Sequence, residues 1–80
     1  MNRIKPIMVK PLDDYRLEIL FSTMEIRIFD CKPYLTGDWF AKLLNKKKFN
    51  SVRIAGNTVE WSGGQDLCPD CLYDNSIPVN

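Results

Sequence analysis

The sequence has no histidine in its 80 residues. Histidine is the most common general base, the side chain that titrates near neutral pH, and the most common metal ligand. Basic and acidic residues also nearly balance, at 11 against 10. Proteins that bind nucleic acid through phosphate contacts usually carry a clear basic excess on one face. We therefore expect no enzyme, no catalytic residue and no cofactor, and we disfavour nucleic acid as a partner.

Long apolar runs and a disulfide framework are also missing. No segment approaches the ~20 apolar residues that a membrane span needs, and the N-terminal sequence MNRIKPIMVKP lacks the apolar run of a signal peptide. The 3 cysteines are an odd number, and two of them lie close together. This pattern is typical of a reducing compartment. We expect a cytoplasmic protein that forms a single domain over residues 1–80 around one core.

Alternating apolar residues predict the first strands. The segment Ile4–Pro11 is interrupted by prolines, which cannot donate to a ladder, so this strand should lie at a sheet edge. The segments Tyr15–Phe21 and Glu25–Phe29 alternate, and the short link between them predicts a hairpin. Placing Phe21 opposite Ile26 puts the buried side on Leu17, Ile19, Phe21, Ile26 and Ile28.

This register leaves an apolar pair, Leu20 and Phe29, on a face that otherwise carries Arg16, Glu18 and Arg27. The pair is either partly exposed, covered by a neighbouring segment, or part of an interaction patch. Leu20, Phe29, Arg16, Arg27 and Arg53 are the candidate binding residues.

The second half predicts a helix, a hairpin and a short helix. Asp38 is expected to cap a helix over Asp38–Asn45, whose apolar stripe is Trp39, Phe40, Leu43 and Leu44. The following Lys46–Lys48 either offset the helix dipole or contact an anion or nucleic acid. A Gly56-Asn57 turn joins Ser51–Ala55 to Thr58–Trp61 and places Arg53 opposite Glu60. Asp66 is then expected to cap a helix that has Pro69 near its start and ends near Tyr73.

The predicted fold is α+β with two layers, in the order strand, hairpin, helix, hairpin, short helix around a mainly antiparallel sheet. The predicted core adds residues from the second half to those above: Phe40, Leu43, Leu44, Val52, Ile54, Val59, Trp61, Leu67, Leu72 and Tyr73.

Several segments resemble one family. They are Val9–Pro11, Asp14–Phe21, Arg27–Asp30, Pro33–Leu35, Phe49–Arg53 and, most specifically, Trp61–Asp70 with Leu72 and Tyr73. Together they are similar to the uncharacterised bacterial domain-of-unknown-function 2442 family, from about Ile4 to Pro78. The structural signature residues are Trp61, Asp66, Pro69, Leu72 and Tyr73.

The resemblance implies a small α+β fold, like the N-terminal domain of proteins that elsewhere carry a helix-turn-helix. It also implies a non-catalytic role in toxin–antitoxin-like gene pairs, and it supplies no catalytic residues. No helix-turn-helix follows here, so the resemblance does not imply DNA binding. The family usually has glycine where this chain has Met24, which implies a first turn of different shape. Cys68 and Cys71 are not part of the family pattern.

The cysteines allow three interpretations. A structural zinc site usually has four ligands, and here Cys31, Cys68 and Cys71 would need a carboxylate to join them. A redox pair at Cys68 and Cys71 lacks the surrounding βαβ pattern. The simplest interpretation is that both cysteines flank Leu67 and Leu72 and seat the last helix on the sheet.

We therefore expect a small non-enzymatic domain that binds another protein, in its sharpest version the neutralising partner of a toxin. An exposed sheet edge would allow a homo-oligomer. Two alternatives stay open. One is a nucleic-acid-associated regulator that uses the sheet arginines and Lys46–Lys48, and the other is a zinc- or thiol-dependent protein that uses Cys68 and Cys71.

Overall fold

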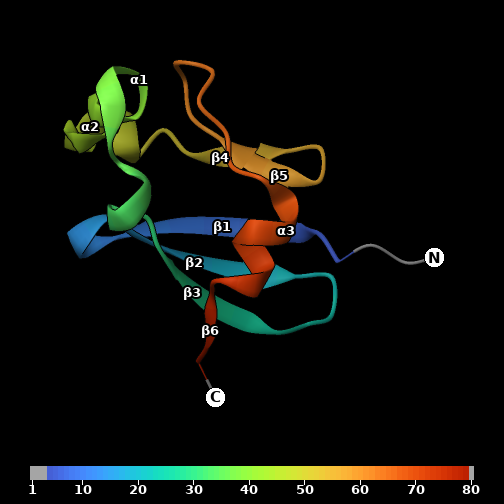
Figure 1. Ribbon diagram of the computed structural model, residues 1–80. Helices are drawn as coiled ribbons and strands as arrows, with labels where there is room; N and C mark the ends of the chain where they lie inside the picture. The colour runs from blue at the N-terminus through green and yellow to red at the C-terminus, as the bar shows by residue number, and fades with distance from the viewer. Residues whose placement is uncertain (1–3, 80) are drawn as a thin grey trace.

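A four-stranded antiparallel sheet forms one half of the molecule in the computed structural model, which describes residues 4–79 (Figure 1). Its strands lie in the order β1-β2-β3-β6 and span Pro6–Leu12, Arg16–Phe21, Ile26–Asp30 and Ile77–Pro78. A separate hairpin pairs β4 (Arg53–Ala55) with β5 (Thr58–Glu60). The α+β class and the antiparallel pairing are confirmed, but the second hairpin forms a sheet of its own.

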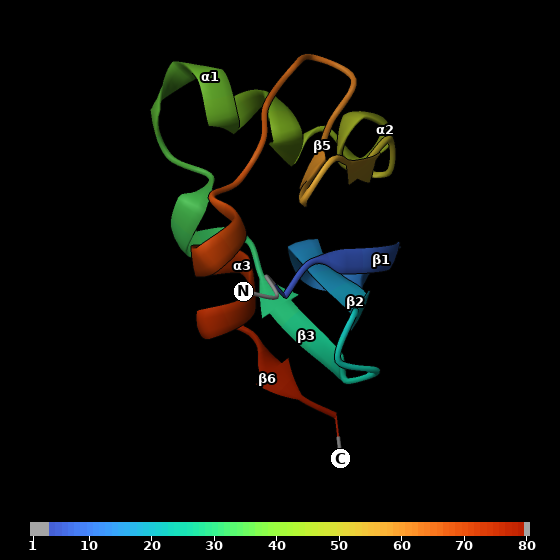
Figure 2. The ribbon, with the colours of Figure 1, turned by 90° about the vertical axis from the view of Figure 1, so that its right-hand side faces the viewer.

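The helical segments are short. Within residues 4–79, three are α-helical: α1 (Gly37–Ala41), α2 (Lys46–Phe49) and α3 (Pro69–Asp74). The same residues contain three 3₁₀ turns: Asp13–Tyr15, Lys32–Tyr34 and Lys42–Leu44. Helix α3 lies on one face of the four-stranded sheet, while α1, α2 and the β4–β5 hairpin lie together beyond the β1 edge (Figures 1 and 2). Among residues 4–79, no helix has both the length and the apolar character needed to cross a membrane.

Strand β1 forms an edge of the sheet, as its prolines predict. It runs from Pro6 to Leu12, two residues later at its start than expected, with an irregular register between Pro6 and Met8. The other edge is β6, a two-residue strand that the sequence pattern did not indicate.

The register predicted for the first hairpin is wrong by one residue. Phe21 N–H donates to the Glu25 carbonyl at 2.9 Å and Met24 N–H donates to the Phe21 carbonyl at 2.8 Å, so the turn closes on Phe21 and Glu25. Met24 has φ 72°, the left-handed region that favours glycine. Leu20 therefore faces Ile26, and each later pair shifts with it.

A one-residue shift exchanges the two faces of β3. Phe29 now lies opposite Leu17 and is fully buried, stacked on the Tyr34 ring with the ring centroids 5.3 Å apart. Ile26 is 43% exposed and Ile28 is half-buried. The prediction that places Phe29 on the outer face, and Ile26 and Ile28 in the core, is therefore wrong.

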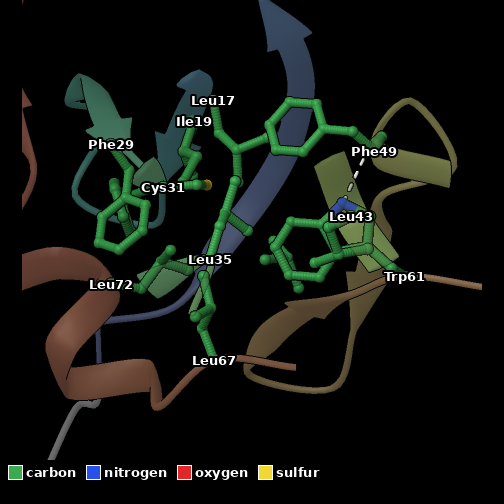
Figure 3. Close-up of a cluster of buried hydrophobic side chains, with 12 residues drawn as sticks. Leu17, Ile19, Phe29, Cys31, Leu35, Leu43, Phe49, Trp61, Leu67 and Leu72 are labelled. Carbon is green, nitrogen blue, oxygen red and sulfur yellow. Dashed lines mark hydrogen bonds between the residues drawn. The ribbon is translucent and has the colours of Figure 1, made fainter. Parts of the chain in front are cut away.

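The core joins the inner face of the four-stranded sheet, which is the face that α3 covers, to a second layer formed by α1, α2 and the β4–β5 hairpin (Figure 3). The side chain of Trp61 lies between them, and its indole Nε1–H donates to the Phe49 carbonyl at 2.9 Å. Leu44, predicted as core, is 49% exposed. Among residues 4–79, four members of the buried hydrophobic core lie outside the predicted core: Phe29, Cys31, Leu35 and Phe49. The remaining predicted core residues are buried or packed against the core: Leu17, Ile19, Phe21, Phe40, Leu43, Val52, Ile54, Val59, Trp61, Leu67, Leu72 and Tyr73.

The expected helix over residues 38–45 is two shorter segments. Helix α1 begins at Gly37, and Asp38 lies in its first turn instead of capping it. Asn45 ends the first segment and caps α2, because its side-chain oxygen accepts from the N–H groups of Lys47 and Lys48. Lys46–Lys48 therefore begin a new helix rather than following the end of the first. The side chain of Trp39 lies outside the described residues.

The second hairpin matches its prediction. Arg53 lies opposite Glu60 and forms an ion pair with it at 2.9 Å, and Gly56 takes a positive φ in the turn. Asp66 does not cap the last helix, because it forms a bridge pair with Glu60. Residue Cys68 occupies the capping position instead, and Pro69 is the first residue of α3.

Candidate functional site

The face of the four-stranded sheet that points away from α3 carries rows of apolar residues and is uncovered by any element described over residues 4–79 (Figure 2). Residues that pair directly across strands share a face. Met8, Leu20 and Ile26 therefore form one row across β1, β2 and β3, and Ile28 and Ile77 form a second row across β3 and β6. We call these five residues, with the charged residues between them, the open face.

Much of the apolar surface of the open face is accessible. Met8 is 64% exposed and Ile77 is 70% exposed, and Val79 extends the patch because its N–H donates to the Ile26 carbonyl at 3.0 Å. A depression of about 200 Å³ lies on this surface, lined by Met8, Val9, Lys10, Glu18, Leu20 and Ile26. Exposed patches of this kind are uncommon on proteins that have no partner.

Charges on the open face balance. Lys10 lies opposite Glu18, and Arg16 lies opposite Asp30. These pairs put two cations and two anions on the face. Asp30 also pairs with Lys32 at 3.1 Å, and Lys32 reaches Asp14 at 2.9 Å. The side-chain hydrogen bond from Lys32 lowers the pKa of Asp14.

The predicted binding residues separate onto different surfaces. Leu20 and Arg16 lie on the open face, as expected. Phe29 and Arg27 lie on the opposite face, Phe29 in the core and Arg27 under α3. Arg53 belongs to the second hairpin and pairs with Glu60.

The contacts of Arg27 are all within the fold, so this residue has a structural role. Its Nη1 pairs with Glu25 at 2.9 Å, its Nε donates to the Ser76 hydroxyl at 2.7 Å, and its Nη2 donates to the Ser76 carbonyl at 2.7 Å. The guanidinium also lies 4.4 Å from the centre of the Tyr73 ring. The Tyr73 hydroxyl donates to Glu25, and this hydrogen bond first, then those from Thr23 and Arg27, lowers the Glu25 pKa.

Lys46–Lys48 belong to α2, which lies with α1 and the β4–β5 hairpin beyond the β1 edge of the sheet (Figure 1). A second depression, of about 310 Å³, separates this helix from the first 3₁₀ turn. Asp14 and Tyr15 take positive φ at its edge, and the Tyr15 hydroxyl donates to the Leu44 carbonyl. The basic candidates therefore do not form one surface.

The three cysteines do not form one site. Cys31 is buried in the core, where burial raises its pKa to about 12. Cys68 is exposed and Cys71 is half-buried. Among residues 4–79, no group of three His, Cys, Asp or Glu side chains is placed to hold a metal ion. The expectation that Cys68 seats the last helix is wrong, because its side chain faces solvent.

The signature residues act mainly in the fold. Trp61 and Leu72 are buried, and the Tyr73 ring meets Phe21 edge to face at 5.0 Å. Pro69 starts α3, and Asp66 connects to β5. The run from Trp61 to Tyr73 thus fastens α3 to the inner face of the sheet, which leaves the other face uncovered.

Residues 6–78 match the sequence profile of a family described as "Protein of unknown function (DUF2442)". The chain belongs to this family. The DUF2442 match begins at the first residue of β1 and ends at the last residue of β6, so the family region coincides with the folded unit. No curated protein and no solved structure matches the chain.

Proposed function

We propose that the protein is a small non-enzymatic binding domain and that another protein covers its open face. The observation that carries this proposal is the apolar surface made by the row of Met8, Leu20 and Ile26 and by the neighbouring row of Ile28 and Ile77. Covering such surface is favourable by roughly 25 cal/mol for each Å² removed from water.

The charge pattern supports a protein partner over a nucleic acid. Phosphate binding needs a surface with excess cations. The open face carries Lys10 and Arg16 beside Glu18 and Asp30, so it offers a polyanion no net attraction. A protein with a flat apolar centre and a mixed polar rim is the complement of this surface.

The face, rather than an edge, is the proposed contact. Both edge strands contain proline, Pro6 and Pro11 in β1 and Pro78 in β6, and proline removes a donor from the edge. Helix α3 packs on the opposite face, so a partner can bind without displacing the core. In the sharpest version, which rests on the family resemblance, this partner is a toxin that the domain neutralises.

The test uses two matched variants that each place a lysine on an exposed apolar site. Ile26→Lys alters the open face, and Leu44→Lys alters a site in the second layer with similar exposure, 49% against 43%. Each is co-expressed with the product of the adjacent gene, and the affinity of the purified pair is measured by calorimetry.

We expect Ile26→Lys to lose binding by about tenfold or more, because burying an unpaired charge in an apolar interface costs over 1.4 kcal/mol, while Leu44→Lys binds like the native protein. Equal affinity of the two variants would contradict the open face as the interface. Absence of binding to the adjacent gene product would remove the toxin-neutralising version. If the native protein self-associates and only Ile26→Lys disrupts this, the partner at the open face is a second copy of the chain rather than another protein.

A further inference from the structure

Cys68 and Cys71 lie at the start of the last helix, Cys68 exposed and Cys71 half-buried. Cys68 directly precedes α3 and Cys71 is the third residue of that helix. Residues three apart at the start of a helix are neighbours on one turn. Neither cysteine belongs to the buried core, although Cys71 is half-buried. Packing therefore does not account for the pair. Cys31, by contrast, is buried and is part of the hydrophobic core.

The two thiols have different chemical environments. The pKa of Cys68 is lowered, because the backbone N–H groups of Cys71 and Asp70 stabilise its thiolate. The Cys71 thiol makes a smaller contribution in the same direction. The Cys68 sulfur makes no capping hydrogen bond of standard geometry, so these amides act as nearby dipoles. The hydrogen bond with Cys68 raises the pKa of Cys71, and the charges of Asp70 and Asp74 raise it further.

An exposed cysteine with a lowered pKa, followed by a second cysteine on the same helical turn, is the arrangement of a thiol–disulfide exchange site. The thiolate is the nucleophile, and it must be accessible to an incoming disulfide. Cys68 is exposed and its lowered pKa favours the thiolate form. Cys71 follows three residues later on the same helical turn, where it can attack a mixed disulfide formed on Cys68. Residues three apart on a helical turn are also neighbours, so closure needs little backbone movement.

We propose that Cys68 and Cys71 are a thiol–disulfide exchange site that accepts small disulfides of the glutathione class and closes into an intramolecular disulfide. The site lies beside α3 on the inner side of the sheet, away from the open face. The proposal is thus independent of the proposed protein partner.

The reaction proceeds in two balanced steps. The Cys68 thiolate attacks one sulfur of oxidised glutathione, the glutathione S–S bond breaks, and one glutathione leaves as a thiolate that takes up a proton. Cys71 then loses its proton and attacks the Cys68 sulfur, which breaks the mixed disulfide and releases the second glutathione. The two protein thiols are oxidised, one glutathione disulfide is reduced to two thiols, and the protons lost by the cysteines end on glutathione.

The test treats the reduced full chain with oxidised glutathione and counts free thiols by alkylation and intact mass, before and after denaturation. We expect two of the 3 cysteines to become unreactive and a proteolytic fragment to carry a bond between Cys68 and Cys71. Cys31 should stay reduced and react only after unfolding, because it is buried.

Serine variants separate the roles of the two thiols. The Cys71→Ser variant should stop at one glutathione adduct on Cys68. The Cys68→Ser variant should form its adduct on Cys71, and the rate of this reaction should be lower than the rate in Cys71→Ser. Cys31→Ser is the control and should oxidise like the native protein, with tryptophan fluorescence confirming that each variant is folded.

Three results would overturn the proposal. The first is a native protein that keeps all its thiols or stops at a stable glutathione adduct. The second is an adduct that forms equally fast on Cys68 and Cys71 in the two variants. The third is a disulfide that includes Cys31.

Discussion

The register of the first hairpin makes a prediction about which residues of β3 hold the fold together. Phe29 is fully buried opposite Leu17, whereas Ile26 is 43% exposed on the open face. Truncating a buried phenylalanine to alanine costs about 3–5 kcal/mol, and truncating an exposed strand residue costs at most about 1 kcal/mol. We therefore expect Phe29→Ala to destabilise the protein far more than Ile26→Ala.

The size of the domain sets the design of this experiment. A chain of 80 residues has a free energy of unfolding of roughly 4–12 kcal/mol, so Phe29→Ala removes a large part of it. The milder Phe29→Leu should cost about 1–2 kcal/mol and lower Tm by roughly 4–16 °C. Urea titration followed by tryptophan fluorescence measures each variant, because Trp61 is buried and becomes exposed on unfolding.

The result that would refute this reasoning is a reversed order. If Ile26→Ala lowers the free energy of unfolding more than Phe29→Leu does, the inner face contains Ile26 and the register is the one that the sequence pattern predicts. The open face would then lose the residue on which the proposed function most depends.

Three further predictions concern the turn of the first hairpin, the loss of stability at low pH and a hydrogen bond in the core. Met24→Gly should raise stability by about 0.5–1 kcal/mol, because Met24 has φ 72° and glycine carries no steric penalty there; an unchanged or lower Tm would contradict this. The Tyr73 hydrogen bond lowers the Glu25 pKa below its ordinary 4.5, so the stability from this carboxylate is present above pH 4.5 and is lost as pH falls through the folded-state pKa. As pH falls through this range, the urea midpoint of Glu25→Gln should fall less steeply than that of the native protein. Equal pH dependence of the two midpoints would show that Glu25 does not contribute to the loss of stability in acid. Trp61→Phe should cost about 1–3 kcal/mol in urea titration, because it removes part of a buried side chain together with the shorter of the two hydrogen bonds that the Phe49 carbonyl accepts, the other coming from Val52 N–H at 3.3 Å. A cost near zero would show that these interactions contribute little.

Local patterns predicted the elements better than they predicted the register. The alternation of β2 assigns Leu17, Ile19 and Phe21 to one face, and the structure confirms it. In β3, however, the pattern of isoleucines at alternate positions points to the wrong face. Arg27 takes the inner position because Glu25, Ser76 and Tyr73 satisfy its guanidinium there. Two of these partners lie more than 40 residues away in the sequence, so no local pattern contains them.

The helix boundaries had a signal that was missed. Asn45 is a preferred capping residue, and its position directly before Lys46 indicates the start of a new helix. The end of the sheet had no such signal, because β6 is only two residues long and one of them is Pro78. Without β6, the sequence could not place Ile77 on the open face.

The candidate site was therefore predicted only in part. Leu20 and Arg16 lie where the alternation of β2 puts them, but the apolar surface around Leu20 comes from Met8 and Ile26, whose faces depend on pairing. The accessibility of Cys68 was also hidden, because C-x-x-C spacing is the same for buried and exposed pairs.

The most direct test of the central claim is a map of methyl NMR signals while the adjacent gene product is added. We expect the signals from Met8, Leu20, Ile26 and Ile77 to shift or broaden, while those from the exposed Leu44 stay unchanged. Changes at Leu44 with an undisturbed open face would contradict the open face as the interface.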